Sequence, residues 1–253
     1  MCRSKAEGGW RCAAHLPKRI TRYGPTDAAW ITDPDRRAMN EPNKVIAVYG
    51  KQSAGAALNI GLRIMSVEHG ITKDIKEITP TGWRDAKLDE RVKAPESIAR
   101  KVDKALVLRQ VPVKVSAAKF YDALRYTLVA PGADDFAYAV QASLADLVSR
   151  DYGLVEMSDR FLPHNSYMAF HSIASDHGIV TVSFEIQFHT EESFAIKMQT
   201  DPWYHHARVV GANADTVAAI TEKSRKLSST IEIPKGLDNI EVEDKKPIKK
   251  KMG

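Results

Sequence analysis

The run at residues 179–189 constrains the fold more than any other part of the chain, because its side chains alternate strictly between apolar and polar. Successive side chains of a strand point to opposite faces of a sheet, so this pattern predicts a half-buried β-strand. Its apolar face holds Val180, Val182, Phe184, Ile186 and Phe188. The other face carries a carboxylate, an amide and an imidazole in a row, at Glu185, Gln187 and His189. Such a row is typical of a sheet face exposed to solvent. The alternative is that these three side chains belong to a functional site.

Helical spacing of apolar residues surrounds this strand on both sides. It occurs at 93–107, with Pro95 in the first turn where its missing N–H does no harm, at 136–148 and at 212–227. A second short apolar strand, Thr127–Val129, ends at a Pro-Gly turn signal. We therefore predict an α+β fold, with a mixed β-sheet flanked by helices.

Composition shifts divide the chain into five segments. Residues 1–43 show little periodicity and are expected to form an irregular basic arm, and residues 44–85 a helical extension. The main domain is expected at 86–210, followed by a C-terminal helix at 211–231 and a charged tail at 232–253. We expect the arm and the tail to be loosely attached.

The net charge of +5 comes from the two ends of the chain. The 253 residues contain 37 Lys and Arg against 32 Asp and Glu. Without residues 1–22 and 245–253 the body has 26 basic and 31 acidic residues, a net charge of −5. A wholly basic nucleic-acid-binding body is therefore excluded, although basic arms are not.

The cysteines and the hydropathy pattern bear on the compartment. No run approaches the roughly 18 to 20 apolar residues that span a bilayer, and the basic N-terminus lacks the apolar stretch of a signal peptide, so we expect a cytoplasmic protein without a membrane partner. Two cysteines do not make a disulfide framework. Cys2, Cys12 and His15 offer three zinc ligands where a structural site needs four, so we expect a reduced arm, with a metal as the alternative.

A cluster of cations precedes and enters the helix predicted at 93–107. Arg91 and Lys93 lie at its entrance, and Ser97 and Lys101 share one helical face. Cations at a helix N-terminus can bind a polyphosphate, because the backbone N–H groups and the helix dipole add to the side chains. A solvated basic face is the alternative.

Two further segments carry candidate chemical groups. Asp122 and Arg125 lie in Phe120–Tyr126, which leads into the strand at 127–129. A loop after Pro163 holds Asn165, Tyr167 and His171. Asp122 and Glu185 could together hold Mg²⁺, which favours one or two carboxylates plus substrate phosphates.

In order and spacing these motifs resemble the synthetase domain of RelA/SpoT-type enzymes, especially the small alarmone synthetases. The family pattern Arg-x-Lys-x-x-x-Ser-x-x-x-Lys matches at Arg91, Lys93, Ser97 and Lys101, and Asp122 stands where the family has its catalytic Asp. The loop Asn-Gly-Tyr-x-Ser-Leu-His and the strand Glu-Val-Gln-Ile-Arg-Thr match at Asn165, Tyr167, His171, Glu185, Gln187 and Thr190. The resemblance covers about residues 86–208, roughly half of the chain.

The resemblance implies a nucleotidyltransferase-like fold and an ATP pyrophosphokinase, in which the 3′-hydroxyl of an acceptor attacks the β-phosphate of ATP. Lys93, Ser97 and Lys101 would hold the phosphates, and Arg91 would stack on adenine. Asp122 and Glu185 would hold Mg²⁺, and Glu185 would also orient or deprotonate the hydroxyl. The acceptor would be bound by Asn165, Tyr167, His171, Gln187 and His189.

Three departures from the family pattern affect the acceptor more than the fold. Arg125 and Thr127 replace the Gly and Arg that usually follow the Asp, so Arg125 is the candidate second contact to adenine. Ser166 replaces the Gly of the loop. His189 replaces an Arg, so a fixed positive charge becomes titratable.

Three functions stay open from the sequence. The first is synthesis of a guanosine or adenosine alarmone, as a toxin or under tight control by an antitoxin or inhibitor protein. The second is a toxin that modifies the 3′ end of tRNA, with the basic ends binding the acceptor stem. The third is a non-catalytic, phage- or virion-associated binding module that keeps the fold. Whether the chain forms a homo-oligomer is also open.

Overall fold

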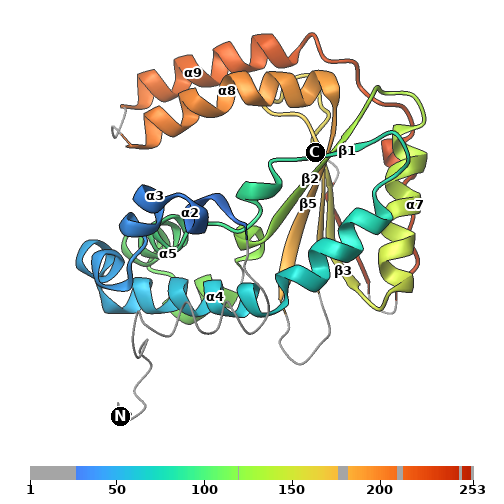
Figure 1. Ribbon diagram of the computed structural model, residues 1–253. Coiled ribbons are helices and arrows are strands. Elements are labelled where there is room, and N and C mark those ends of the chain that lie inside the picture. Colours follow the sequence, from blue (N-terminus) through green and yellow to red (C-terminus); the bar gives the residue numbers. More distant parts are fainter. Residues whose placement is uncertain (1–26, 119, 176–181, 210–212, 245–246, 252–253) are drawn as a thin grey trace. The chain divides into compact units, whose positions relative to one another are not determined.

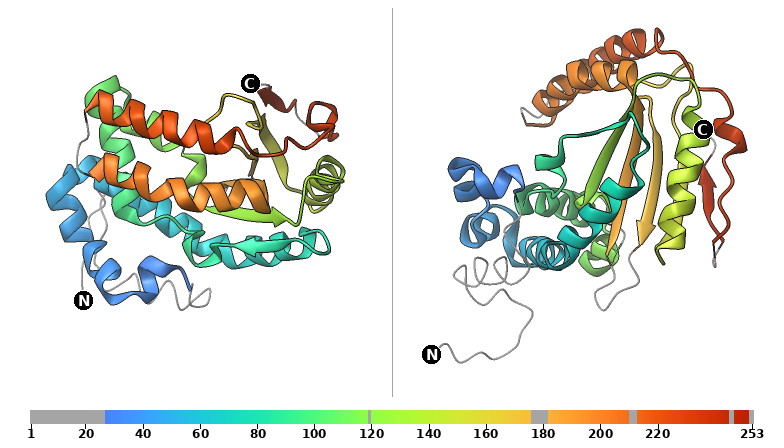
Figure 2. Two further views of the ribbon diagram at one scale, coloured as in Figure 1. Left: turned by 90° about the horizontal axis from the view of Figure 1, so that it is seen from above. Right: turned by 45° about the vertical axis from the view of Figure 1, so that its right-hand side comes forward.

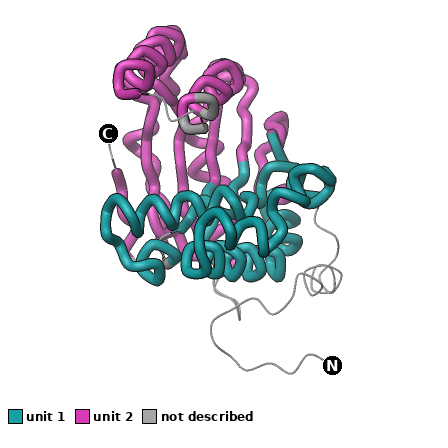
Figure 3. Tube along the Cα trace, turned by 90° about the vertical axis from the view of Figure 1, so that its left-hand side faces the viewer, with its two compact units in different colours: residues 1–75, 87–126, 176–185 teal, residues 76–86, 127–175, 186–253 magenta. Residues whose placement is uncertain are grey.

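A computed structural model of the chain describes residues 27–118, 120–175, 182–209, 213–244 and 247–251 (Figure 1). The chain divides into two compact units, which Figure 3 shows in different colours. The first unit comprises residues 1–75, 87–126 and 176–185, and the second comprises 76–86, 127–175 and 186–253. The candidate metal ligands Cys2, Cys12 and His15 lie outside the described residues.

The first unit is mainly helical. Its elements are α2 (Ala29–Thr32), α3 (Pro34–Met39), most of α4 (Pro42–Ile78), η1 (Leu88–Glu90), α5 (Pro95–Arg109), α6 (Val113–Ala118) and η2 (Tyr121–Ala123). Gly50 interrupts α4 with a φ of 72°, which a residue without a Cβ adopts without strain. Helix α5 has Pro95 in its first turn as predicted, although it begins two residues later than the predicted 93–107, and it buries Ile98, Ala99 and Val102.

Residues 27–39 differ from the irregular arm that the sequence suggested. The Asp33 side chain accepts hydrogen bonds from the backbone N–H groups of Asp35 and Arg36, and Pro34 follows at the first helical position. This is a helix N-cap, and it starts α3 although the segment is too short to show apolar periodicity. Trp30 of α2 is buried. The segment therefore forms two short helices, of which α2 packs into the protein through Trp30 and α3 stays largely exposed.

The second unit holds a six-stranded mixed sheet in the order β1-β2-β5-β4-β3-β6. The strands are β1 (Arg84–Ala86), β2 (Arg125–Ala130), β3 (Gly153–Asp159), β4 (Phe170–Ser175), β5 (Ser183–Thr190) and β6 (Lys249–Lys251). β3 pairs antiparallel with β4 and parallel with β6, and β1 pairs antiparallel with β2. The first residues of β2 and β5, up to Tyr126 and Glu185, belong to the first unit. The predicted α+β fold with a mixed sheet is confirmed.

The helices of the second unit are α7 (Phe136–Ser149), α8 (Glu191–Val209), α9 (Ala214–Ser228) and η3 (Leu237–Asn239). Helices α8 and α9 lie side by side, as both views of Figure 2 show. Aromatic rings from several segments pack in the core of the second unit. Trp83 is stacked on Phe136, with 5.2 Å between the ring centroids. Phe136 also meets Phe161 edge to face at 5.5 Å. Such pairs add to the stabilisation from buried apolar area.

The C-terminal segment packs against the sheet instead of lying loosely attached. Leu237 and Ile240 are buried, and the Asp244 side chain accepts a hydrogen bond of 2.6 Å from the backbone N–H of Leu154. Lys251 forms a 2.7 Å ion pair with Glu156 of β3. The C-terminal segment is thus held by its buried apolar residues and by the carboxylate of Glu156, although its charge alone suggested a solvated tail.

Candidate functional site

Backbone hydrogen bonds bring three of the predicted motifs together in the first unit. The N–H of Lys93 donates to the carbonyl of Ala123 at 2.9 Å, and the N–H of Arg125 donates to the carbonyl of Arg91 at 2.8 Å. The N–H of Glu185 donates to the carbonyl of Leu124 at 3.0 Å. The entrance to α5, the segment around Asp122 and the start of β5 are therefore neighbours, as the motif order led us to expect.

Asp122 binds two lysines at once. Its Oδ2 atom accepts a 2.5 Å hydrogen bond from Nζ of Lys93 and another from Nζ of Lys101, which lies two turns along α5. Both ammonium groups also lie over the ring of Phe120, at 5.7 Å and 5.3 Å from its centroid. A carboxylate and a π-face thus hold two positive charges close together, although like charges repel.

Burial and neighbouring charges shift the pKa values in this cluster. Burial above all, and the charges of Lys101 and Arg125, lower the pKa of Lys93 to about 8, against the raising effect of Asp122. Burial alone would raise the pKa of Asp122, but the two ammonium groups outweigh it and lower this pKa to about 2. Asp122 is therefore ionised at neutral pH, and Lys93 is charged but close to its titration range.

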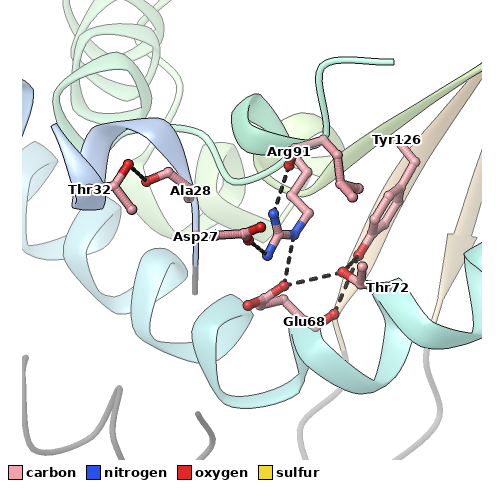
Figure 4. A network of polar contacts seen from close by, with 8 residues as sticks. Asp27, Ala28, Thr32, Glu68, Thr72, Arg91 and Tyr126 are labelled. Carbon is pink, nitrogen blue, oxygen red and sulfur yellow. Dashed lines mark hydrogen bonds and ion pairs between the residues drawn. The ribbon is translucent and has the colours of Figure 1, made fainter. Parts of the chain in front are cut away.

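Arg91 is buried in a network of polar contacts (Figure 4). Its Nε donates to Oε2 of Glu68 at 2.9 Å, its Nη1 donates to the carbonyl of Leu88 at 2.7 Å, and its Nη2 forms an ion pair with Asp27. Burial works to lower the pKa of Arg91, but the carboxylates of Glu68 and Asp27 raise it overall.

The network continues from Glu68 through two hydroxyl groups. Thr72 donates to Oε2 of Glu68 at 3.2 Å, and its hydroxyl lies 2.8 Å from that of Tyr126 (Figure 4). Arg91 and Glu68 are 5% and 3% exposed, so each depends on the other for charge compensation. The family resemblance places Arg91 against adenine, and here the edges of its guanidinium are already bonded inside the protein.

A pocket with about 510 Å³ of empty space, part of it open to solvent, lies beside this network in the first unit. Its lining includes four of the predicted donor-site residues and Asp122, and it also includes residues of α2, α3 and η1. The lining residues are Ala29, Trp30, Arg36, Asp89, Glu90, Arg91, Val92, Lys93, Ala94, Ser97, Asp122 and Arg125.

Contacts from α3 and α4 organise the start of α5. The backbone N–H of Glu96 donates to Oδ1 of Asn40 at 2.8 Å, so a remote amide caps the helix. The hydroxyl of Ser97 donates to the Glu96 carboxylate at 3.3 Å, and the hydroxyl of Tyr49 donates to it at 2.5 Å. Burial and the charge and hydrogen bond of Glu96 raise the pKa of Tyr49 to about 12.

The predicted acceptor residues lie in the second unit, where Tyr167 connects two histidines. The Tyr167 hydroxyl lies 3.1 Å from Nε2 of His189 and 3.2 Å from Nε2 of His171. The Nδ1 atom of His189 lies 2.9 Å from the hydroxyl of Ser193. His171 belongs to β4, where the sequence suggested a loop.

The polar row on β5 is not a solvated face at its far end. His189 is 0% exposed and Gln187 is 4% exposed. Oε1 of Gln187 has no hydrogen-bond partner among the described residues, and a buried carbonyl oxygen without a bond is costly. Asn165 instead donates from Nδ2 to the carbonyl of Arg160 at 2.9 Å, a contact typical of a residue that shapes a loop.

Several site residues gave no signal in the sequence. Glu68 lies within the long helix α4, where a buried carboxylate and a solvated one look alike in sequence. Asp27 and Trp30 precede or belong to a helix of four residues, which is too short for periodicity to detect. A search for three or more His, Cys, Asp or Glu residues that could hold a metal ion finds no such group in the described part of the chain. Likewise, the described helices include none with the length and hydrophobicity to cross a membrane.

Comparisons with known proteins find similarity in structure. No family model matches the chain. No curated protein matches it in sequence. Its structure is similar to that of small alarmone synthetase 1 from Bacillus subtilis, with a TM-score of 0.47 and 16% identity over 66% of this chain and 87% of that chain.

Two further solved structures are similar over comparable lengths. A GTP pyrophosphokinase family protein from Streptococcus pneumoniae has a TM-score of 0.42 and 14% identity, over 69% of this chain and 84% of that chain. The Type VI effector Tas1, in complex with its immunity protein, has a TM-score of 0.37 and 20% identity, over 69% of this chain and 92% of that chain. The structural resemblance that the motifs predicted is thus found, at low sequence identity.

Proposed function

We propose that the chain is an ATP-dependent pyrophosphokinase, which transfers the β,γ-pyrophosphate of ATP to the 3′-hydroxyl of a nucleotide acceptor. One observation supports this most: two lysines converge on Asp122 beside a pocket that also contains Ser97 and Arg125. Two ammonium groups so close together are stabilised by a polyanion, and a triphosphate brings several negative charges to them. A solvated basic helix face would have no reason to bury Lys93.

In this proposal, Lys93, Ser97 and Lys101 bind the phosphates of ATP. Asp122 keeps the two ammonium groups in position before the nucleotide arrives, so little reorganisation is needed on binding. Arg91 would offer the plane of its guanidinium to the base, because its N–H groups are engaged by Glu68, Asp27 and the carbonyl of Leu88. Arg125 lines the same pocket and would add positive charge near the nucleotide.

The oxygen ligands present are compatible with Mg²⁺ that arrives with the nucleotide. Only Oδ2 of Asp122 is hydrogen-bonded among the described residues, which leaves Oδ1 as a ligand, and the backbone of Glu185 pairs with Leu124, two residues from Asp122. Mg²⁺ prefers oxygen ligands and usually needs only one or two carboxylates besides phosphates. Asp122 and Glu185 would hold it, and it would neutralise charge on the transferring phosphoryl group.

The transfer forms one P–O bond and breaks another. The acceptor 3′-oxygen bonds to the β-phosphorus, the bond between the β-phosphorus and the oxygen that bridges to the α-phosphate breaks, and AMP leaves with that oxygen. Glu185 would accept the proton of the hydroxyl or orient it. Tyr167, His171, Gln187 and His189, with Asn165 shaping the loop, would bind the acceptor. Positioning and charge neutralisation carry most of such a reaction.

The test is incubation with γ-labelled ATP and Mg²⁺ and a choice of acceptors, namely GDP, GTP, AMP and deacylated tRNA. Label in a mononucleotide is the expected result, and Glu185→Gln should abolish it without changing the melting temperature. Glu222→Gln is the matched control, because Glu222 pairs only with Arg225 on α9 among the described contacts. ATP binding without transfer to any acceptor would favour a non-catalytic module and overturn the proposal.

Label on tRNA would identify the alternative acceptor. That acceptor needs basic residues available for phosphates. Lys249, Lys250 and Lys251 each lie within 4.0 Å of a carboxylate of Glu156 or Glu241, so the described part of the tail is partly neutralised. This favours a mononucleotide over tRNA as the acceptor. If the activity proves toxic in cells, co-purification with the chain would identify an inhibitor protein.

A further inference from the structure

The segment from Asp27 to Arg36 forms part of the wall of the pocket. Ala29, Trp30 and Arg36 line it, and Asp27 forms an ion pair with Arg91, which lines it as well (Figure 4). The carbonyl of Ala28 accepts hydrogen bonds from the N–H groups of Ile31 and Thr32, at 2.8 Å and 3.1 Å. These contacts fix the short helix α2 beside the candidate site, within one unit.

Trp30 is the one aromatic residue among the described residues that line this pocket. It is 6% exposed. Most of the other lining side chains are charged, which suits phosphates and a metal ion but not the flat apolar faces of a purine. An aromatic ring provides such a face, and base stacking on aromatic side chains is favourable for every base.

We propose that Trp30 is the residue against which the base of the donor nucleotide packs, in an aromatic wall that Asp27 holds in place through Arg91. The inference rests on the proposed function, because it takes ATP as the ligand of this pocket. It assigns an apolar contact with the base to Trp30 of α2, beside the guanidinium plane of Arg91, and Arg91 also links α2 to the phosphate-binding residues at the start of α5.

Two substitutions of Trp30 can distinguish packing of its ring from hydrogen bonding by its indole nitrogen. Nε1 is buried and has no hydrogen-bond partner among the described residues. A buried donor without a bond is destabilising, so Trp30→Phe removes that cost while it retains an aromatic ring. Trp30→Ala removes the ring. The two variants therefore distinguish an aromatic wall from a hydrogen-bond donor.

The experiment is titration calorimetry of the full chain with Mg-ATP and, separately, with Mg-tripolyphosphate, which has no base. Trp30→Ala should weaken ATP binding about 5- to 100-fold, and should change tripolyphosphate binding by less than about twofold. Trp30→Phe should weaken ATP binding by less than about threefold. Trp203→Ala is the control tryptophan, because Trp203 contacts Lys223 in the second unit and lies outside the pocket.

The carboxylate of Asp27 provides an independent check. Asp27→Ala releases α2 from Arg91 and should reproduce part of the loss for ATP and none for tripolyphosphate. Asp35→Ala is its control, because the side chain of Asp35 makes no hydrogen bond or ion pair among the described residues.

The possible results separate this inference from the proposed function. If the unaltered chain bound tripolyphosphate and ATP equally well, or if Trp30→Ala weakened both equally, the base would not pack on Trp30, although phosphate binding at the lysines would stand. If the unaltered chain bound neither, the proposed function would be wrong and this inference with it. Should Trp30→Ala fail to fold, Trp30→Leu takes its place, and an ATP affinity equal to that of the unaltered chain would overturn the inference.

Discussion

The Nζ atom of Lys93 lies 2.5 Å from Oδ2 of Asp122, the same oxygen that binds Lys101. This contact is unusual because the lysine is largely buried, and burial lowers its pKa to about 8. Two ammonium groups therefore share one carboxylate oxygen. The ammonium group of Lys93 can lose its proton near physiological pH.

ATP binding should weaken as the pH rises through about 8. Lys93 carries its charge below its pKa and loses it above, so the attraction for phosphate falls between about pH 7 and pH 9.5. Lys93→Arg should remove most of this pH dependence, because a guanidinium stays protonated throughout. Calorimetric affinities for Mg-ATP at four pH values would show this. An equally steep pH dependence in Lys93→Arg would contradict it.

Asp122 should contribute to stability at neutral pH and not at strongly acidic pH. Its pKa is about 2 in the folded chain against 3.8 for the ordinary side chain, so its contribution is present above about pH 3.8 and is lost as the pH falls towards 2. The shift corresponds to a free energy on the order of 2 kcal/mol. Urea unfolding of Asp122→Asn and the unaltered chain at pH 7 should differ by about this amount. The difference should shrink at about pH 3, and Asp134→Asn serves as the control.

The sequence predicted the lysine cluster and Asp122, but not the network around Arg91. Helical spacing places Ser97 and Lys101 on one face, and the order of motifs indicated that Asp122 would lie nearby. The partners of Arg91 come from Asp27 and from Glu68 in the middle of α4. No local pattern distinguishes a carboxylate that compensates a buried guanidinium from one in water, because the difference arises only when distant segments pack.

The alternation at 179–189 predicted β5 correctly from Ser183 to His189, while residues 179–181 lie outside the described part of the chain, and it misled about one face of the strand. β5 lies between β2 and β4 in the sheet, and Tyr167 and Ser193 bond to His189 from neighbouring segments. Polar residues that satisfy one another can fill a buried face as well as water can. Alternation predicts which residues share a face, and does not tell whether other polar residues cover it.

Removing the charge of Glu68 should destabilise the first unit strongly. Glu68 and Arg91 are both buried, so Glu68→Ala leaves a buried guanidinium with less compensation, at a cost of about 3 to 5 kcal/mol. Asp27 is the exposed partner of the same guanidinium, with 71% of its side chain accessible. Asp27→Ala should therefore cost less than about 1 kcal/mol. Urea unfolding monitored by circular dichroism gives both values, and equal costs would argue against the buried pair as the main source of stability.

The hydroxyl of Tyr167 should matter for stability and for acceptor binding together. It bonds to both His171 and His189, and His189 is 0% exposed. Tyr167→Phe keeps the ring but removes both bonds, and the loss of a bond to a buried polar group costs about 1 to 3 kcal/mol. Tyr138→Phe is the matched control, because Tyr138 is 76% exposed, and it should be neutral.

The acceptor measurement separates structure from function in the same variant. If the hydroxyl positions the two imidazoles for the acceptor, Tyr167→Phe should raise the KM for the acceptor found in the labelling experiment and leave the KM for ATP unchanged, because the residues proposed to bind ATP belong to the first unit. A rise in both constants would indicate that the substitution also disturbs ATP binding, whereas a loss of folded enzyme would lower the apparent kcat and leave both KM values unchanged. An unchanged acceptor KM, with the expected loss of stability, would show that this cluster serves the core of the second unit and not the acceptor.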